Sequence, residues 1–192
     1  MGSKGNDMMA FLNGLATTES EEETIDKMSR FIHIGESLGY DMQACKATRD
    51  QLREKVKRKW VARLCAGHGV AFLGVQETWV SNVNLFEIRS MWGNLSFDFA
   101  VSSACGLSGG LMSMWDPSAF TKKRVISMEN VLIAEGEWLF KKLKCFMINV
   151  YAPHQESQKR ALWETLKTFI QTNDEEFVVF GDFNAVRNRG ER

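Results

Sequence analysis

The sequence predicts an α/β protein, and two observations support this. Three apolar runs have the length of strands rather than of helices, at residues 70–75, 145–150 and 177–180. Segments before and between these runs place apolar residues three or four positions apart, which is the spacing of amphipathic helices. Strands separated by helices are typical of layered α/β folds.

The composition is that of an ordinary globular protein. Of the 192 residues, 44% are hydrophobic and 25% are charged, and the formal net charge is zero, so any nucleic-acid contact must come from a local basic patch. The four cysteines are widely spaced and indicate reduced thiols in an intracellular protein: Cys45, Cys65, Cys105 and Cys145. No apolar stretch has membrane-spanning length and no signal peptide is recognisable, so we expect no membrane partner.

The N-terminal part is acidic. Residues 1–50 carry 5 Lys and Arg against 9 Asp and Glu, and we expect them to form a spacer before a domain that covers residues 51–192. The first two dozen residues are rich in Gly, Ser, Thr and Glu, which predicts disorder. From Thr24, apolar residues at helical spacing predict a helix to about Leu38, and Gly39 is expected to end it.

A second helix is expected to run to about Ala66, with Thr48 or Asp50 as its N-cap. Its apolar residues recur every four positions and are expected to face a core: Leu52, Val56, Trp60 and Leu64. The other positions from 53 to 63 are rich in Lys and Arg. This basic face either contacts phosphates, or is a solvated helix exterior, or is a nuclear-import signal, and the sequence leaves these alternatives open.

Beyond the first apolar run, the pattern predicts a helix, four strands and a further helix before the last run. The helix is expected at residues 82–91, and the strands at 97–102, 110–115, 131–138 and 143–151. After Pro153, an amphipathic helix is indicated by the spacing of Leu162, Leu166, Phe169 and Ile170, and Asn173 and Asp174 are expected to end it.

Polar residues follow each of the three apolar runs at once. They are Gln76-Glu77-Thr78, Tyr151-Ala152-Pro153-His154 and Gly181-Asp182-Phe183-Asn184. Residues two apart in an extended chain point the same way, so Asp182 and Asn184 would face a common space. That space lies at the carboxyl end of a strand, where open α/β sheets bind ligands. The alternative is that Gly, Asp and Asn only form a turn here.

Four segments, in this order, resemble motifs of the endonuclease/exonuclease/phosphatase superfamily: Gln76-Glu77-Thr78, Ser108-Gly109-Gly110-Leu111, Asn149-Val150-Tyr151-Ala152-Pro153 and Gly181-Asp182-Phe183-Asn184. They are most similar to the apurinic-type endonuclease domain of plant non-LTR (LINE-type) retrotransposons, over about Lys57 to Arg192. The resemblance implies an incomplete layered α/β sandwich of that type with a helical N-terminal extension. It also implies Mg²⁺ as cofactor, with Mn²⁺ as a substitute, DNA as partner, and a reverse transcriptase domain in the parent polyprotein.

The resemblance also assigns roles to residues of this chain. Glu77 would be the metal ligand, and Tyr151 would contact the scissile phosphate. Asp182 would orient or deprotonate the attacking water, and Asn184 would hydrogen-bond the phosphate. DNA contacts are expected from Lys57, Arg58, Lys59 and His154. The simpler alternatives are that Glu77 stabilises a helix N-terminus and that Tyr151 is a core aromatic residue.

Two parts of the family pattern have no counterpart here. The family's first strand ends in an asparagine that helps to hold the metal, and no such run precedes Lys57. The family's closing strands carry a Ser-Asp-His motif with a second carboxylate and a catalytic histidine, and the sequence stops at Arg192 before any such motif. We therefore expect a truncated endonuclease with weak or lost DNA binding and little or no catalysis. The alternatives are a non-catalytic remnant with weak nucleic-acid contact and a phosphatase for lipid head groups or other small phosphoesters.

Overall fold

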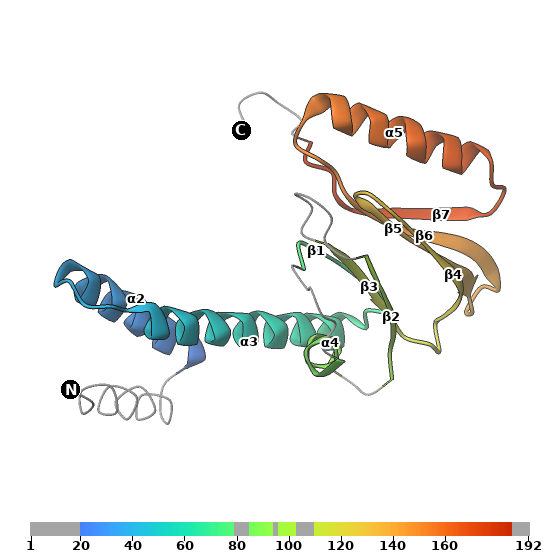
Figure 1. The fold of residues 1–192 in the computed structure, drawn as a ribbon. Helices are drawn as coiled ribbons and strands as arrows, with labels where there is room; N and C mark the ends of the chain where they lie inside the picture. Colours follow the sequence, from blue (N-terminus) through green and yellow to red (C-terminus); the bar gives the residue numbers. More distant parts are fainter. Residues whose placement is uncertain (1–19, 79–84, 94–95, 103–109, 186–192) are drawn as a thin grey trace. The chain divides into compact units, whose positions relative to one another are not determined.

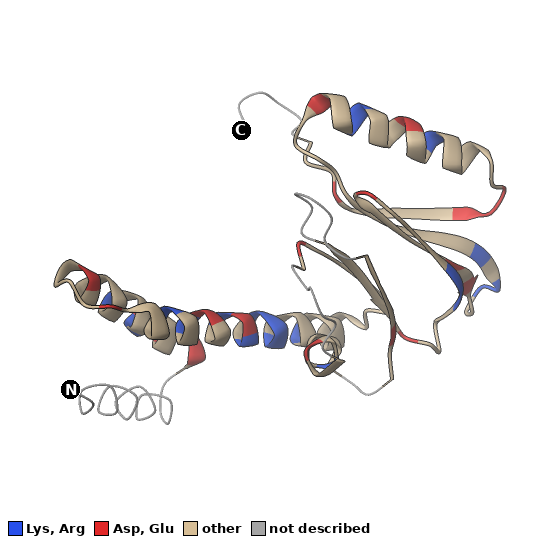
Figure 2. Ribbon diagram, in the orientation of Figure 1, with Lys and Arg blue, Asp and Glu red and all other residues tan. Residues whose placement is uncertain are grey.

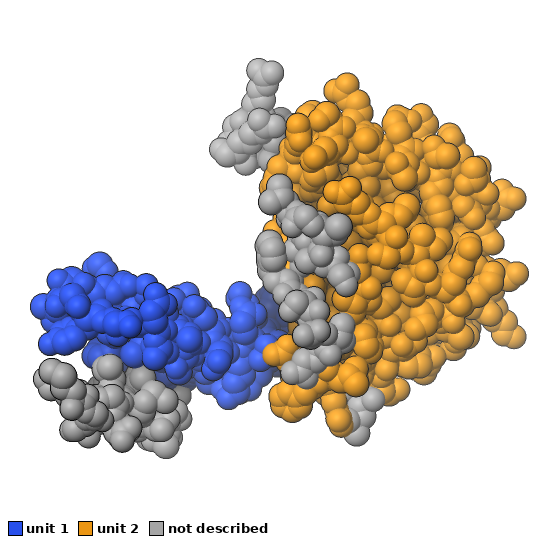
Figure 3. Space-filling model, in the orientation of Figure 1, with its two compact units in different colours: residues 1–63 blue, residues 64–192 orange. Residues whose placement is uncertain are grey.

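The computed structural model describes residues 20–78, 85–93, 96–102 and 110–185. The chain divides into two compact units, Met1–Arg63 and Leu64–Arg192 (Figure 3). In chain order the elements are α2 (Glu21–Ser37), α3 (Gln43–His68), β1 (Phe72–Gln76), α4 (Leu85–Trp92), β2 (Asp98–Ser102), β3 (Leu111–Trp115), β4 (Phe120–Met128), β5 (Val131–Trp138), β6 (Leu143–Tyr151), α5 (Glu156–Gln171) and β7 (Glu176–Asp182) (Figure 1). The boundary expected after residue 50 stays a prediction.

The helix predicted over residues 24–38 is confirmed as α2. It begins earlier than expected because the hydroxyl of Ser20 accepts a hydrogen bond from the main-chain nitrogen of Glu23 (3.2 Å) and so caps the helix. The glutamates of the first turn, residues 21–23, suit the positive end of the helix dipole. Gly39 follows the helix with a φ of 79°, a left-handed conformation that favours glycine. The disorder predicted for the first two dozen residues is wrong for residues 21–24, which form the first turn of α2. Residues 1–19 lie outside the described residues.

α3 begins earlier than predicted because Oδ1 of Asp41 accepts a hydrogen bond from the main-chain nitrogen of Gln43 (3.0 Å). The N-caps predicted at Thr48 and Asp50 were therefore wrong, and both residues lie inside the helix. Although α3 has 26 residues, neither it nor any other helix in the described ranges is long and apolar enough to cross a membrane.

The core-facing stripe predicted for α3 is wrong at Trp60 and Leu64, which are 59% and 38% exposed. Each step of four residues advances by about 400° around a helix, so Leu52 and Leu64 point in directions about 120° apart. One flat partner surface cannot cover both. The buried cluster of the first unit instead joins α2 to the start of α3, and it contains Ile32, Met42 and Cys45 with Phe31 packed against them.

The second unit contains two sheets. β1, β3 and β2 form an antiparallel sheet in that order. In the other sheet, β4, β5 and β6 are antiparallel neighbours, and β7 runs parallel to β6 after the α5 crossover. The predicted strands and the helix after Pro153 are confirmed, as is the predicted helix before β2 from Leu85 onward. β4 was not predicted, because Lys122, Lys123 and Arg124 interrupt its alternation, and its register with β5 shifts there.

The two sheets pack face to face, and one helix covers the outer face of each (Figure 1). The space between the sheets is filled by Ala100, Leu111, Trp115, Phe120, Leu132, Ala134, Cys145 and Met147. On the outside, Leu162 and Leu166 of α5 pack against β5 and β6. Ile88 and Trp92 of α4 pack against β3. The layers therefore run helix, sheet, sheet, helix, which confirms the predicted layered α/β sandwich.

β7 departs from the prediction of a buried strand. Val178 and Val179 are 45% and 38% exposed, because β7 pairs with β6 on one side and no described strand pairs with its other side. Phe177 packs beneath α5, and Phe180 reaches the core between the sheets. The strand ends at the polar residues that form the candidate site.

Candidate active site

Three strands bring their polar residues to one end of the sandwich. β6 and β7 are parallel, so their carboxyl ends lie together, and Tyr151 and Asp182 are register partners. β1 belongs to the other sheet, and Glu77 follows its last residue. The hydroxyl of Tyr151 donates a hydrogen bond to Oε1 of Glu77, which joins the two sheets at this point. The structure thus brings together Glu77, Tyr151 and Asp182.

The phenol of Tyr151 is held in its neutral form. The hydrogen bond to Glu77 is the largest cause, followed by desolvation and then by the negative charges of Glu77 and Asp182, and together they raise the pKa of Tyr151 from 10.0 to about 12. Near neutral pH the hydroxyl is therefore a hydrogen-bond donor. Glu77 has a φ of 53°, which is uncommon for a residue other than glycine and must be held by its surroundings.

The turn after β7 has one defined shape. The main-chain nitrogen of Asn184 donates to Oδ1 of Asp182 (2.8 Å), and Asn184 has a φ of 44°. Gly181 has a φ of 132°, and a Cβ atom there would lie 2.0 Å from the main-chain oxygen of Val150. The turn chemistry considered as an alternative is therefore present, and it positions Asp182.

Lys159 of α5 also holds this turn in place, through a hydrogen bond to its main chain. Its Nζ donates to the main-chain oxygen of Asn184 (2.6 Å), and its side chain is 12% exposed. The side-chain amide of Asn184 donates to the main-chain oxygen of Ala152 (2.5 Å). Sequence reasoning missed Lys159. The one available signal was a lysine in the first turn of a helix, where the dipole disfavours a positive charge.

A pair of carboxamides, of which Asn149 is buried and Gln76 is half-buried, lies between the sheets near the same end. Nε2 of Gln76 donates to Oδ1 of Asn149 (2.6 Å), and Asn149 is fully buried. Both residues belong to motifs that carry the family resemblance, but sequence reasoning gave neither one a role.

Of the four residues predicted to contact DNA, three are exposed and Arg58 is half-buried. His154 is exposed between β6 and α5. On α3, Lys57 bonds Glu54 (2.8 Å) and Lys59 bonds Glu21 (2.6 Å). Figure 2 shows acidic residues among the basic ones along α2 and α3, so part of the positive charge is balanced locally. Contact of Lys57, Arg58, Lys59 and His154 with DNA stays a prediction.

The carboxylate oxygens of Glu77 and Asp182 are ligand atoms of the type that a hard cation such as Mg²⁺ prefers. In the described ranges, no three His, Cys, Asp or Glu side chains gather closely enough to hold a metal ion. Mg²⁺ does not require such a cage, since one or two carboxylates, waters and substrate phosphates are sufficient. Glu77 fits the single carboxylate ligand of a site of this kind.

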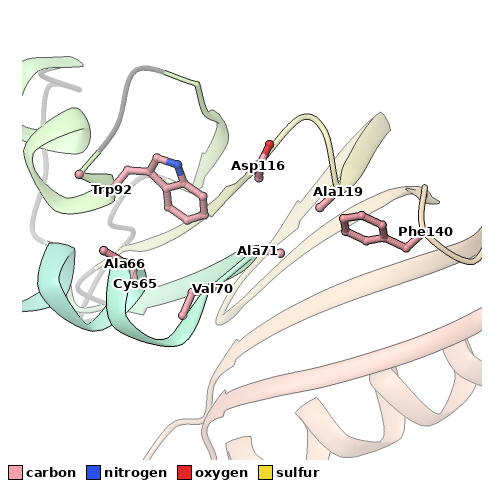
Figure 4. A pocket seen from close by; sticks show the side chains of 10 residues that line it. Cys65, Ala66, Val70, Ala71, Trp92, Asp116, Ala119 and Phe140 are labelled. Atoms are coloured by element: carbon pink, nitrogen blue, oxygen red, sulfur yellow. The ribbon is translucent and has the colours of Figure 1, made fainter.

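A pocket of about 340 Å³ lies elsewhere in the second unit (Figure 4). Its lining includes Cys65, Val70, Ala71, Trp92, Asp116 and Phe140. Val70 and Ala71 precede β1 whereas Glu77 follows it, so the pocket and the candidate site lie at opposite ends of this strand. Burial raises the pKa of Cys65, which keeps its thiol protonated near neutral pH. No residue of the candidate site lines this pocket.

No protein-family model matches the sequence, and no curated protein matches it. Solved structures do match. TDP2 from Caenorhabditis elegans has 19% identity and a TM-score of 0.51, with 69% of this chain and 43% of that chain covered. D. rerio TDP2 complexed with single strand DNA product has 14% identity and a TM-score of 0.50, with 70% and 55% covered. The mannosyl-6-phosphatase of Bacteroides thetaiotaomicron has 11% identity and a TM-score of 0.51, with 70% and 60% covered.

The fold is that of the endonuclease/exonuclease/phosphatase proteins. The likeness extends over about 70% of this chain, while the matched part spans roughly half the length of those proteins, from 43% to 60% in these three. At such low identity the likeness shows the fold alone. The origin in a retrotransposon is not addressed by these matches and stays a prediction.

Proposed function

We propose that this chain carries a Mg²⁺-dependent phosphodiesterase site of retroelement origin that acts on DNA and turns over slowly. The observation that carries the proposal is the convergence of Glu77, Tyr151 and Asp182 at the carboxyl ends of β1, β6 and β7. Ligands of α/β sheets bind at this end of the strands. Two carboxylates beside a neutral phenol form a site suited to a cation and a phosphate together.

Each residue has a role that its chemistry permits. Glu77 would hold the cation, which supplies positive charge against the phosphoryl oxygens when it is bound. Tyr151, with its raised pKa, donates a hydrogen bond from a neutral hydroxyl to a phosphate oxygen. Asp182 orients the attacking water and accepts its proton. Asn184 would donate to a phosphate oxygen after its amide leaves the main-chain oxygen of Ala152.

Slow turnover is expected because no histidine in the described ranges forms a hydrogen bond or ion pair with Glu77, Tyr151 or Asp182, so none is positioned to protonate the leaving oxygen. The chain has three histidines, all within the described ranges, and His33 and His68 lie on α2 and α3. His154 is exposed in a connection. Loss of one group that stabilises charge in the transition state costs on the order of a hundredfold in rate. DNA is the proposed substrate because the motif residues resemble an endonuclease, and one protein of the same fold was solved with a DNA product.

Nicking of supercoiled plasmid with Mg²⁺ or Mn²⁺ tests the proposal. We expect slow, metal-dependent nicking that Glu77→Gln and Asp182→Ala each abolish. Glu129→Gln is the matched control, since Glu129 is an exposed glutamate in the turn between β4 and β5 and should leave the rate unchanged. Direct titration of Mn²⁺ by electron paramagnetic resonance should show binding that Glu77→Gln weakens.

Three other outcomes would count against the proposal. Equal nicking by all variants would indicate a contaminating nuclease. Metal binding without nicking would favour the non-catalytic remnant. Release of phosphate from a sugar phosphate or a phosphoinositide, without nicking, would favour a small-phosphoester phosphatase.

A further inference from the structure

We infer that Gln76 and Asn149 are positioning residues for this site, and that their two carboxamides fix the end of β1 against β6 and so set the distance between the Glu77 carboxylate and the Tyr151 hydroxyl. The inference rests on the proposed function, in which both of those groups act on one phosphodiester. We refer to Gln76 and Asn149 together as the carboxamide clamp.

Each residue of the carboxamide clamp lies close in sequence to one of the two site residues, Glu77 on β1 and Tyr151 on β6. Nε2 of Gln76 donates to Oδ1 of Asn149 (2.6 Å), across the interface between the two sheets. Gln76 directly precedes Glu77. Asn149 stands two residues before Tyr151, so both side chains are on the same face of β6. A shift of β1 at Gln76 is therefore passed directly to Glu77.

The orientation of the clamp follows from the chemistry of its partners. Nδ2 of Asn149 donates to the main-chain oxygen of Met112 (3.0 Å) and approaches Oγ of Ser113 (3.4 Å). A carbonyl oxygen can only accept, so the nitrogen of the Asn149 amide must face Met112, and its oxygen must face Gln76. A flipped amide would place two oxygens against each other in a fully buried position, which is costly. The side-chain nitrogen of Gln76 must therefore face Oδ1 of Asn149.

β1 packs closely against its neighbours at Gly74. A Cβ atom on Gly74 would lie 2.3 Å from the ring of Phe180 and 3.0 Å from Nδ2 of Asn149. β1 thus passes close over the clamp and over β7. Glu77 needs such support, because its φ of 53° is unfavourable for a residue with a side chain. A directional hydrogen bond to a buried group holds one register more strictly than an apolar contact does.

The clamp can be tested without metal or substrate, through the hydrogen bond of Tyr151. The chain has two tyrosines, and Tyr40 is 65% exposed, so Tyr40→Phe leaves Tyr151 as the one phenol. In that background, NMR of tyrosine labelled with ¹³C at Cζ reports whether the hydroxyl still donates to a carboxylate. Glu77→Leu provides the reference signal for the lost bond.

We expect Gln76→Met to move the Tyr151 signal toward that of Glu77→Leu. Two controls should leave the signal in place: Ser113→Ala, which removes the weaker contact of Asn149, and Leu166→Ala, which destabilises the distant α5 packing. Circular dichroism verifies the fold, and Gln76→Ala replaces Gln76→Met if the latter does not fold. An unchanged signal in a folded Gln76 variant would overturn the inference.

A second measurement separates the clamp from the proposed function. Removal of a residue that orients a ligand typically lowers metal affinity by about tenfold or more, so Gln76→Met should weaken Mn²⁺ binding by roughly that factor while Ser113→Ala does not. If the unmodified chain binds no Mn²⁺, the proposed function fails, and the NMR comparison still decides the clamp. If Mn²⁺ binds and Gln76→Met leaves its affinity unchanged, the clamp fails and the proposed function stands.

Discussion

Tyr151 lies opposite Asp182 in the parallel pairing of β6 and β7, while its hydroxyl donates to Glu77 from the other sheet. Tyr151 therefore neighbours two acidic residues, Glu77 and Asp182, that come from strands far apart in the sequence. A neutral phenol is compatible with this arrangement and a phenolate is not, because a third negative charge would be added.

The first prediction concerns the titration of Tyr151. In a Tyr40→Phe background, ultraviolet absorbance of the phenolate should give a pKa of about 12. Glu77→Gln should lower this pKa more than Asp182→Asn does, because the hydrogen bond with Glu77 is the largest cause of the shift and the charge of Asp182 is the smallest. Equal effects of the two substitutions would contradict the geometry.

Alkaline stability provides a second prediction. The folded state raises the pKa of Tyr151 above its ordinary 10.0, so the folded state favours the neutral phenol. The resulting stabilisation is complete below pH 10.0 and is lost as the pH rises toward 12. Urea unfolding across this range should show Tyr151→Phe to be less sensitive to pH than the original chain. Tyr40→Phe is the control and should keep the original dependence.

The features predicted correctly from sequence are local ones. The apolar runs before Gln76, Tyr151 and Asp182 specify strands by their own composition, and the polar residues directly after them mark where the strands end. The approach of Tyr151 to Asp182 depends on the parallel pairing of β6 and β7, which these local patterns did not specify. The sequence indicated it only through the family resemblance.

The features missed depend on contacts between distant segments. The bond from Gln76 to Asn149 joins residues 73 positions apart, and Lys159 reaches Asn184 across 25 positions. No local pattern specifies either contact. The exposure of Val178 was missed for the same reason, since a strand's composition does not say whether both of its edges are paired.

Gly181 should tolerate no side chain. Its φ of 132° is unfavourable for other residues, and a Cβ atom would lie 2.0 Å from the main-chain oxygen of Val150. Gly181→Ala should therefore destabilise the fold by about 2 kcal/mol or more. Denaturant unfolding measures this, with Gly67→Ala as control, because Gly67 lies in α3 where an added Cβ atom would meet open space, and this change should be neutral or stabilising. If Gly181→Ala left the free energy of unfolding unchanged, the end of β7 would be able to relax around the added side chain.

The exposed edge of β7 should make the isolated chain prone to association. Apolar strand edges without a partner pair with other chains, and a lysine on the edge blocks this. Val178→Lys should lower association, measured by light scattering over a range of concentrations. Val125→Lys is the matched control. Val125 is 39% exposed on β4, where neighbouring Lys and Arg already protect the edge, so this substitution should lower association less. A monomer with one sharp thermal transition at every concentration would refute this prediction.

The last prediction concerns the basic segment of α3. Replacement of Lys57, Arg58 and Lys59 with glutamate should weaken DNA binding and reduce its dependence on salt. Each lost phosphate contact should lower the slope of log affinity against log salt by about 0.9 on duplex DNA. The same change of charge at exposed Lys141, Lys142 and Lys144 is the control, and it separates loss of these contacts from a general change in net charge.

The predicted effect of this triple substitution has to be separated from damage to the first unit. Lys59 bonds Glu21 of α2, so a glutamate at position 59 places two negative charges together. Thermal unfolding of the variant identifies such damage, and Lys57→Glu with Arg58→Glu leaves the Lys59 pair intact. If this double variant binds DNA with the slope of the original chain, the basic face is a solvated exterior, and the contact with DNA must come from the candidate site itself.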